Sequence, residues 1–100
     1  NLTEANLTSA FLTNANLSNA NLTKANLTGA ELDKANLTGA NLTEANLSGA
    51  NLKKIKLNGA NLSRANLTDT NLTNTDLSKA NANFKDAIGV IKDQPVTIGK

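Results

Sequence analysis

Leucine recurs at every fifth position from Leu2 through Leu77, and the residue two places before it is most often alanine. Asparagine usually separates the two, and threonine or serine usually follows the leucine. A period of five fits no single regular element. On a helix each step of five turns the side chain by about 140° net, and in one long strand successive leucines point to opposite faces. Neither arrangement gathers the leucines into one core.

A short extended stretch followed by a corner does bring the leucines into one core. In the stretch 25–28, the side chains of Ala25 and Leu27 share one side, and those of Asn26 and Thr28 point to the other. A corner at Thr28 and Gly29 then redirects the chain, so that the next leucine again faces the interior. Repetition of this unit predicts a solenoid whose axis is filled by leucine and alanine.

The unit Ala-Asn-Leu-Thr/Ser-x resembles the pentapeptide repeat family, whose consensus is A-(D/N)-L-x-x. The resemblance covers roughly residues 1–80 and extends to about Ala87. It implies the family's all-β fold, a right-handed quadrilateral parallel β-helix (a β-solenoid), here with about four coils of four pentapeptides. We therefore expect a β-helix over residues 1–87 and a C-terminal capping tail over residues 88–100.

A coil of twenty residues predicts columns of stacked side chains, about 4.8 Å apart. Asp33 would then neighbour Lys53, and Lys56 would neighbour Asp76. One column would alternate in charge, and it consists of Glu4, Lys24, Glu44 and Arg64. Each such exposed pair contributes only about a few tenths of a kcal/mol.

Four glycines occupy corner positions ten residues apart, on two opposite sides of the coil: Gly29, Gly39, Gly49 and Gly59. We expect a positive φ there, as the third residue of a type II turn requires. Asn14, Asn19 and Asn74 occupy the same repeat position and tolerate that geometry. Lys24 suggests instead an ordinary corner.

Some residues depart from the repeat. Phe11 replaces an outward asparagine, so it should be exposed, as a lone surface aromatic or as part of a contact with a partner. Ile55 replaces an inward alanine, which requires wider local packing, and Thr70 and Thr75 are milder changes of that kind. A basic cluster is either a solvated face or, with Phe11, an interaction surface: Lys53, Lys54, Lys56 and Arg64.

The repeat loses its register after Ala80. We expect Phe84 to plug the last coil, and the following apolar residues to cover it: Ile88, Val90, Ile91, Val96 and Ile98. Solenoid ends need such covers. The coil end at Asn1 has none, so we expect it to fray, to be covered by a further segment, or to stack on another copy in a homo-oligomer.

The composition argues against an ordinary globular core and against some classes of partner. Two aromatic residues in 100 are too few for an ordinary globular core. The net charge of +2 gives no electrostatic footprint for nucleic acid, and no aromatic residue stands among the lysines to stack a base. There is no long apolar run, so no membrane span is expected. The chain contains no cysteine, which leaves the redox compartment open, and the cytoplasm is our expectation for its location.

Catalytic chemistry has few candidates. Histidine, cysteine, tyrosine and tryptophan are absent, which removes the common general bases, nucleophilic thiols and metal ligands. Glu31 and Asp33 face outward together, but on a convex surface without a cleft. We therefore predict no enzymatic activity, no catalytic residue, no metal and no cofactor.

Three functions remain open. The first is a structural scaffold that presents flat faces to a protein partner, and such clean repeats are similar to those abundant in cyanobacteria. The second follows from the family's best-known activity, in which an acidic member mimics DNA and binds a type II topoisomerase. The third is an ice-binding β-solenoid, because two faces carry unbroken arrays of asparagine with threonine or serine. The simpler interpretation of these arrays is consensus residues whose side chains bond up and down the coil.

Overall fold

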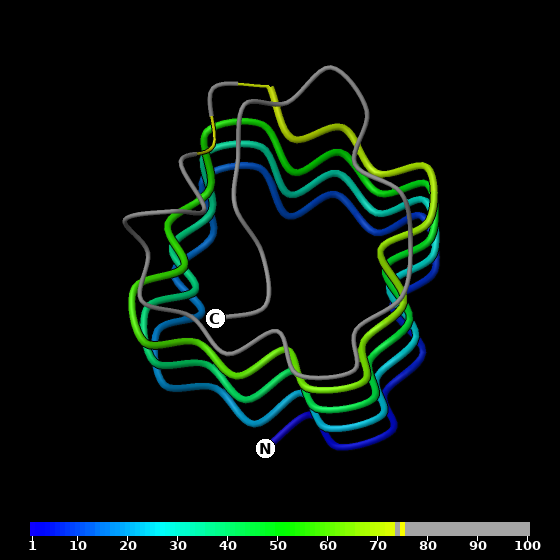
Figure 1. Cartoon of the computed structure of the whole chain (residues 1–100), viewed down its shortest axis with the longest axis vertical. Helices are drawn as coiled ribbons and strands as arrows, with labels where there is room; N and C mark the ends of the chain where they lie inside the picture. Colours follow the sequence, from blue (N-terminus) through cyan, green and yellow to red (C-terminus); the bar gives the residue numbers. More distant parts are fainter. Residues whose placement is uncertain (74, 76–100) are drawn as a thin grey trace.

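The computed structural model describes residues 1–73 and 75, and through them the chain winds into a stack of four-sided coils (Figure 1). Within these residues there is no helix, and no strand is longer than one bridge residue. Bridge residues recur at every fifth position from Asn6 to Asn71, and a two-residue turn follows each one from Asn6 to Asn66. Each side of the coil is thus one short extended unit, as the period of five predicts.

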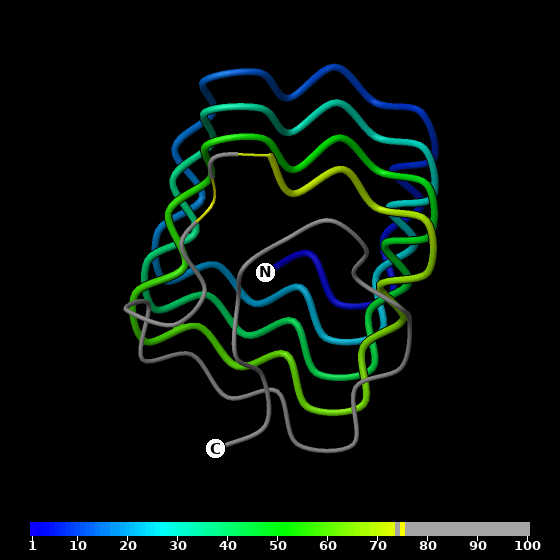
Figure 2. The ribbon, with the colours of Figure 1, turned by 45° about the horizontal axis from the view of Figure 1, so that its top comes forward.

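All ten bridges are parallel and join residues twenty apart, from Asn6 with Asn26 to Asn51 with Asn71. One coil therefore contains four pentapeptides, and successive coils lie directly over one another (Figure 2). This register confirms the predicted quadrilateral parallel β-helix.

Hydrogen bonds satisfy all five backbone N–H groups of a typical repeat. Three N–H groups bond to neighbouring coils, one closes the corner, and the fifth bonds to the side chain of the repeat's own asparagine. For Asn21 through Asn26 these bonds are Leu22 N–H to Asn41 O (2.7 Å), Lys24 N–H to Thr43 O (2.9 Å), Asn26 N–H to Ala5 O (2.9 Å), Ala25 N–H to Leu22 O (3.0 Å) and Thr23 N–H to Asn21 Oδ1 (3.1 Å). The fifth bond explains why asparagine dominates an outward position.

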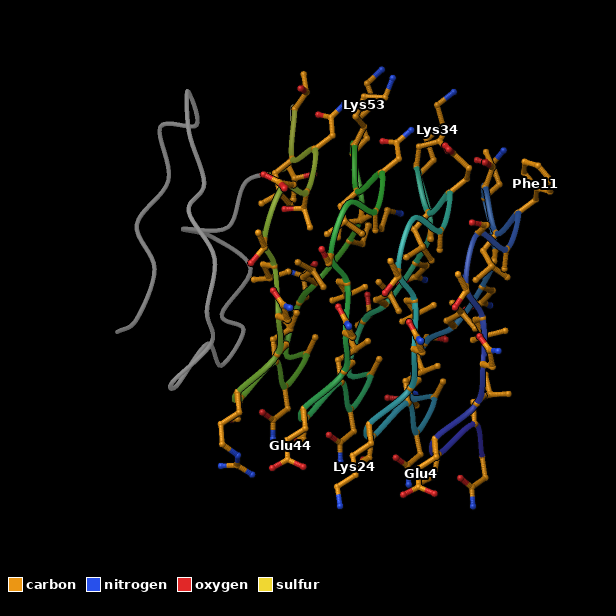
Figure 3. The ribbon with its side chains drawn as sticks, turned by 90° about the vertical axis from the view of Figure 1, so that its right-hand side faces the viewer. Glu4, Phe11, Lys24, Lys34, Glu44 and Lys53 are labelled. Atoms are coloured by element: carbon orange, nitrogen blue, oxygen red, sulfur yellow. The ribbon has the colours of Figure 1, made fainter. Side chains whose placement is uncertain are left out.

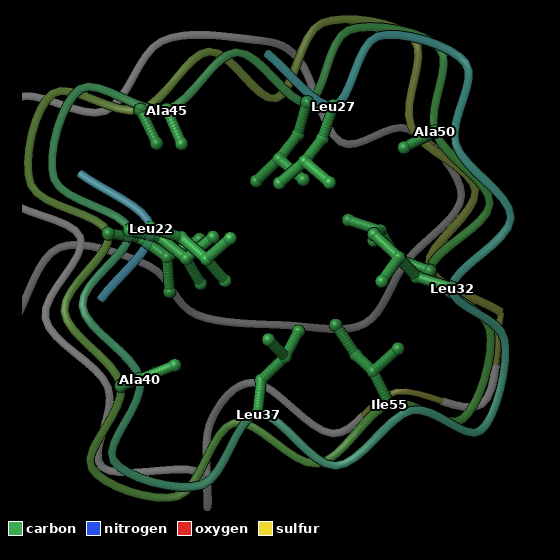
Figure 4. Packing of buried hydrophobic residues seen from close by; sticks show 14 of the residues in the cluster. Leu22, Leu27, Leu32, Leu37, Ala40, Ala45, Ala50 and Ile55 are labelled. Atoms are coloured by element: carbon green, nitrogen blue, oxygen red, sulfur yellow. The ribbon is translucent and has the colours of Figure 1, made fainter. Parts of the chain in front are cut away.

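The core is a set of leucine columns along the axis (Figure 4). Every leucine from Leu22 to Leu72 is buried, and each contributes roughly 1.5–3 kcal/mol before chain entropy. The alanines beside the corners are buried with them, where a larger side chain has little room. Leu2, Leu7, Leu12 and Leu17 are only partly buried, because within the described residues a coil covers them on one side only.

Every described corner has the same backbone geometry. All fourteen corner residues from Glu4 to Asp69 have a positive φ, between 68° and 72° at glycines and between 57° and 66° elsewhere. The expectation is confirmed for the four glycines, Asn14 and Asn19. The expectation of an ordinary corner at Lys24 is wrong, because its φ is 60°. Each corner must bend the chain equally to close a four-sided coil, so the turn is imposed whatever residue occupies it.

Ile55 changes the local hydrogen bonding as well as the packing. Its side chain is buried in the axis (Figure 4), but within the described residues its N–H forms no bond to Leu52 O, the bond that closes the other corners. The hydroxyl of Thr75, in the next coil, donates to Leu52 O at 2.6 Å instead. These two departures lie in one column and compensate each other.

Four predictions fall outside the described residues. They are the corner at Asn74, the neighbouring pair Lys56 and Asp76, the plug at Phe84, and the boundary at residue 87 with its capping tail 88–100. Among the residues that are described, no helix is long and apolar enough to cross a membrane.

Candidate interaction surfaces

The four edges of the β-helix divide into two kinds. Two diagonally opposite edges contain the glycine corners, and the other two contain charged corners. The ladder edge consists of Glu4, Lys24, Glu44 and Arg64. The lysine edge consists of Lys34 and Lys54 at one corner column, with Lys53 and Lys56 flanking Lys54. The two charged edges lie on opposite sides of the molecule (Figure 3).

Charges on the ladder edge neutralise one another. Glu44 Oε2 lies 3.1 Å from Arg64 Nε, and Glu44 Oε1 lies 3.9 Å from Lys24 Nζ. The predicted alternating column is confirmed at these two contacts, whereas Glu4 forms no ion pair with Lys24 in the described structure. The side chains are exposed, so each pair contributes at most about 1 kcal/mol.

The lysine edge has no such compensation among residues 1–73 and 75. Its four side chains are exposed, and none forms an ion pair there. The predicted neighbours Asp33 and Lys53 do not pair. Asp33 Oδ1 instead accepts a hydrogen bond of 2.7 Å from Thr13 Oγ1, which directs the carboxylate toward the preceding coil.

The sequence groups Arg64 with Lys53, Lys54 and Lys56, but the structure separates them. Arg64 belongs to the ladder edge, on the diagonally opposite corner. Lys34 takes its place, because its N–H donates to Lys53 O at 2.8 Å across adjacent coils. The twenty-residue period was the signal that could have found Lys34, since it stands twenty positions before Lys54.

Phe11 is 88% exposed, as expected from its outward position. It heads the column of Glu31 and Asn51, on the same side of the molecule as Lys34 and Lys53 (Figure 3). Because phenylalanine offers no acceptor, the N–H of Thr13 lacks the asparagine bond that other repeats have. Phe11 therefore exposes an aromatic ring and removes a local hydrogen bond.

Asparagine bonds within its own repeat rather than up and down the coil. Wherever a described repeat has an outward asparagine, its Oδ1 accepts from the N–H two residues on, at 3.0–3.2 Å. Threonine or serine hydroxyls often donate to the same oxygen, as Thr23 Oγ1 does to Asn21 Oδ1 at 2.7 Å. The bond from Asn51 Nδ2 to Glu31 Oε1, at 3.0 Å, does run between coils. The expected bonding along the coil is thus an exception.

Departures from the repeat are confined to two adjacent sides of the coil. The variable side comprises residues 11–14, 31–34, 51–54 and 71–73, and the next side comprises residues 16–19, 36–39 and 56–59. These two sides carry every outward non-consensus residue in the described chain: Phe11, Glu31, Asp33, Lys53, Lys56 and Asn58. The other two sides carry only asparagine with threonine or serine, in the arrays expected from the sequence. We call them the consensus sides.

The described residues offer few groups for catalysis or metal binding. They contain no group of three acidic, histidine or cysteine side chains that could hold a metal ion. Glu31 and Asp33, the predicted outward pair, bond to Asn51 and Thr13 respectively. The space within the axis is lined by leucines and Ile55 alone, and so offers no polar group.

Comparison with known proteins identifies the repeat. A sequence profile described as "Pentapeptide repeats (8 copies)" matches residues 1–39, 21–59 and 45–81. A comparison with curated proteins gives no match.

Comparison with a solved structure shows the same fold. The chain is similar to QnrB1, a plasmid-mediated fluoroquinolone resistance protein, with 24% identity and a TM-score of 0.69 over 80% of this chain and 37% of QnrB1. It is 37% identical to Rfr23 from the cyanobacterium Cyanothece 51142, over 94% of this chain and 54% of Rfr23, with a TM-score of 0.48. It is 35% identical to alr5209 from Nostoc PCC 7120, over 88% of this chain and 77% of alr5209, with a TM-score of 0.44. The chain thus spans about half or less of the first two proteins. The family match, the likeness to QnrB1 and the bridge register agree on the right-handed quadrilateral β-helix.

Proposed function

Because this chain belongs to the pentapeptide repeat family, we propose that it is a non-enzymatic scaffold that binds a protein partner through its variable side. The observation that carries the proposal is the confinement of all outward departures to two adjacent sides. A rigid β-helix needs only its consensus residues to stack. Residues that break the pattern on one part of the surface are explained better by contact with another molecule than by the needs of stacking.

The departures also weaken the fold locally. Phe11, Glu31 and Lys56 each replace the asparagine that would accept a backbone N–H, and the amides of Thr13, Asp33 and Asn58 lack that acceptor in the described structure. A net hydrogen bond is worth roughly 0.5–1.5 kcal/mol. Stability alone therefore disfavours these residues, whereas a binding role accounts for them.

Photo-cross-linking in cells of the source organism tests the proposal. A photoreactive residue at position 73 probes the variable side and leaves its non-consensus residues in place. One at position 48, which also directly follows a repeat leucine, probes a consensus side. We expect a discrete cross-linked protein from position 73 and none from position 48. Equal products from both positions, or none from position 73, would contradict the proposal.

A variant with restored consensus residues gives an independent readout. Phe11→Asn, Glu31→Asn, Asp33→Thr and Lys53→Thr together convert the outward positions of the variable side to the pattern of the consensus sides. This variant should fold at least as well as the natural chain and yet lose the cross-link from position 73. Retention of the cross-link would show that the departures do not form the binding surface.

The topoisomerase alternative has weaker support. The likeness to QnrB1, at 24% identity, concerns the fold. A DNA mimic needs rows of negative charge, whereas one charged edge here alternates in sign and the other is basic. Purified chain should therefore leave fluoroquinolone inhibition of gyrase supercoiling unchanged.

The ice-binding alternative rests on the two consensus sides. Their threonine hydroxyls mostly donate to the neighbouring asparagine Oδ1, as Thr28 does at 2.7 Å, and so complete internal bonds. Those bonds account for the arrays without an external ligand. No thermal hysteresis is expected from the purified chain.

A further inference from the structure

We propose that the lysine edge binds an acidic segment of the protein partner through the carboxylates of that segment. This inference rests on the proposed scaffold function and adds the chemistry of the partner. It follows from the contrast between the two charged edges of one molecule. The ladder edge pairs its charges internally through Glu44, whereas Lys34, Lys53 and Lys54 have no ion pair among the described residues.

The backbone brings these lysines together. The bond of 2.8 Å from Lys34 N–H to Lys53 O joins adjacent coils, so Lys34 lies beside both Lys53 and Lys54. Two carboxylates lie on the same side, where Asp33 turns toward the hydroxyl of Thr13 and Glu31 toward the amide of Asn51. These carboxylates keep their charge, but the lysines outnumber them. The lysines repel one another and leave a positive potential along the edge. An anionic partner removes that repulsion.

The backbone conformation of the corner lysines gives a second reason to assign the lysine edge a binding role. Lys34 and Lys54 have φ of 65° and 57°, in the left-handed region that glycine or asparagine adopts at lower cost. Glycine occupies equivalent corners on the two neighbouring edges. Two lysines therefore occupy positions where glycine would be less strained, as do the charged residues of the ladder edge. Lys24 and Arg64 pair with Glu44, whereas Lys34 and Lys54 form no ion pair within the described residues.

An acidic protein segment fits this edge better than a nucleic acid. The three lysines would neutralise few phosphates, and binding through so few contacts weakens steeply with salt. Phe11 lies one coil from Lys34, and it is the one aromatic residue among those that the structure describes, so the edge offers at most a single ring to stack a base. Lys56 flanks the site, and its predicted neighbour Asp76 falls outside the described residues, so the inference depends on Lys34, Lys53 and Lys54.

Fluorescence anisotropy with a labelled polyglutamate peptide tests the inference, at low and at physiological ionic strength. The test variant combines Lys34→Gln with Lys54→Gln. The matched control combines Lys24→Gln with Arg64→Gln on the ladder edge, and so removes the same net charge from corners of the same φ. We expect the test variant to bind about tenfold more weakly than the natural chain, and the control to change by less than about twofold.

Three binding results would overturn the inference. The natural chain could fail to bind polyglutamate at low ionic strength, or both double variants could lose affinity equally, which indicates net charge alone. A labelled single-stranded oligothymidylate could also bind more tightly through the same lysines, which would assign the edge to nucleic acid. The cross-link from position 73, whose probe leaves Lys53 in place, separates this inference from the scaffold proposal. If it persists undiminished in the Lys34→Gln and Lys54→Gln variant, the scaffold stands and the acidic partner does not.

Discussion

At the residue scale, the outward asparagine contributes more than a polar surface. Its Oδ1 accepts the one backbone N–H that neither the neighbouring coils nor the corner satisfies. For Asn16 this oxygen takes both the N–H of Ser18 at 3.1 Å and its hydroxyl at 2.7 Å. Side chains of this type compete well for local backbone donors, which suits them to such turns. Replacement of asparagine should therefore be measurable even at an exposed site.

Phe11→Asn should stabilise the chain, because it restores this bond for the N–H of Thr13 and removes an exposed aromatic ring. We expect a gain of about 0.5–1 kcal/mol, which for a domain of this size raises Tm by roughly 2–8 °C. Circular dichroism during thermal unfolding measures it. Asn16→Phe in the same coil is the matched control and should lower Tm by a similar amount. A lower Tm for Phe11→Asn would show that Phe11 has a structural role.

Gly49→Ala should destabilise the chain through backbone strain alone. Gly49 has a φ of 71°, and a Cβ added there would meet nothing within 4 Å, so no clash contributes. An L-residue in this conformation costs roughly 1–2 kcal/mol, less for asparagine. Gly49→Asn should therefore lie closer to the natural chain in chemical denaturation. Equal stability of the two variants would remove the argument that corner identity matters.

At the scale of the structural element, a substitution at the inward alanine can remove the hydrogen bond that closes a corner, and Ile55 shows how that bond is replaced. Ile55 fits a β-branched side chain into an alanine position, and its corner loses the bond from Ile55 N–H to Leu52 O. Thr75 supplies the missing donor from the coil below. Thr70 differs, because its N–H and its hydroxyl both reach Leu67 O, at 3.3 and 3.1 Å.

Thr75→Val should destabilise the chain by about 1–2 kcal/mol, because it leaves the buried Leu52 carbonyl without a donor. In an Ile55→Ala background the corner bond can reform, and the effect of Thr75→Val should fall below about 0.5 kcal/mol. A double-mutant cycle by chemical denaturation isolates this coupling. Thr70→Val is the control and should have a small effect, since Leu67 O keeps a backbone donor. Additive effects of the two substitutions would contradict the compensation.

At the scale of the whole molecule, the period of five and the resemblance that it supports predict the architecture well. They place Leu22 and Leu27 in the core, Gly29 at a corner, and Glu44 beside Arg64. The partner of a single side chain and the conformation of a single corner are harder to predict from the sequence. Asp33 turns to Thr13 rather than Lys53, because a short carboxylate can reach either neighbour and no pattern ranks them. Lys24 adopts a positive φ because coil closure imposes it. Lys34 joins the lysine edge only through stacking, which a linear reading of charge misses.

The lysine edge exists only because the coils stack in a twenty-residue register. Removal of one whole pentapeptide changes that register and so tests whether binding depends on it. Deletion of residues 41–45 keeps the repeat in phase but shifts all later residues by one side, so that Lys54 no longer lies over Lys34. We expect a folded β-helix by circular dichroism with about tenfold weaker binding of polyglutamate.

Deletion of residues 66–70 is the matched control, because it also removes one pentapeptide but leaves Lys34, Lys53 and Lys54 in their present register. Its affinity for polyglutamate should stay within about twofold of the natural chain. Both deletions remove one acidic residue, Glu44 or Asp69, so they change net charge equally. If the two deletion variants bind equally well, affinity depends on the number of lysines rather than on their stacking, and the edge is not a site. A selective loss in the first variant would locate recognition in an arrangement that exists only in the assembled coil.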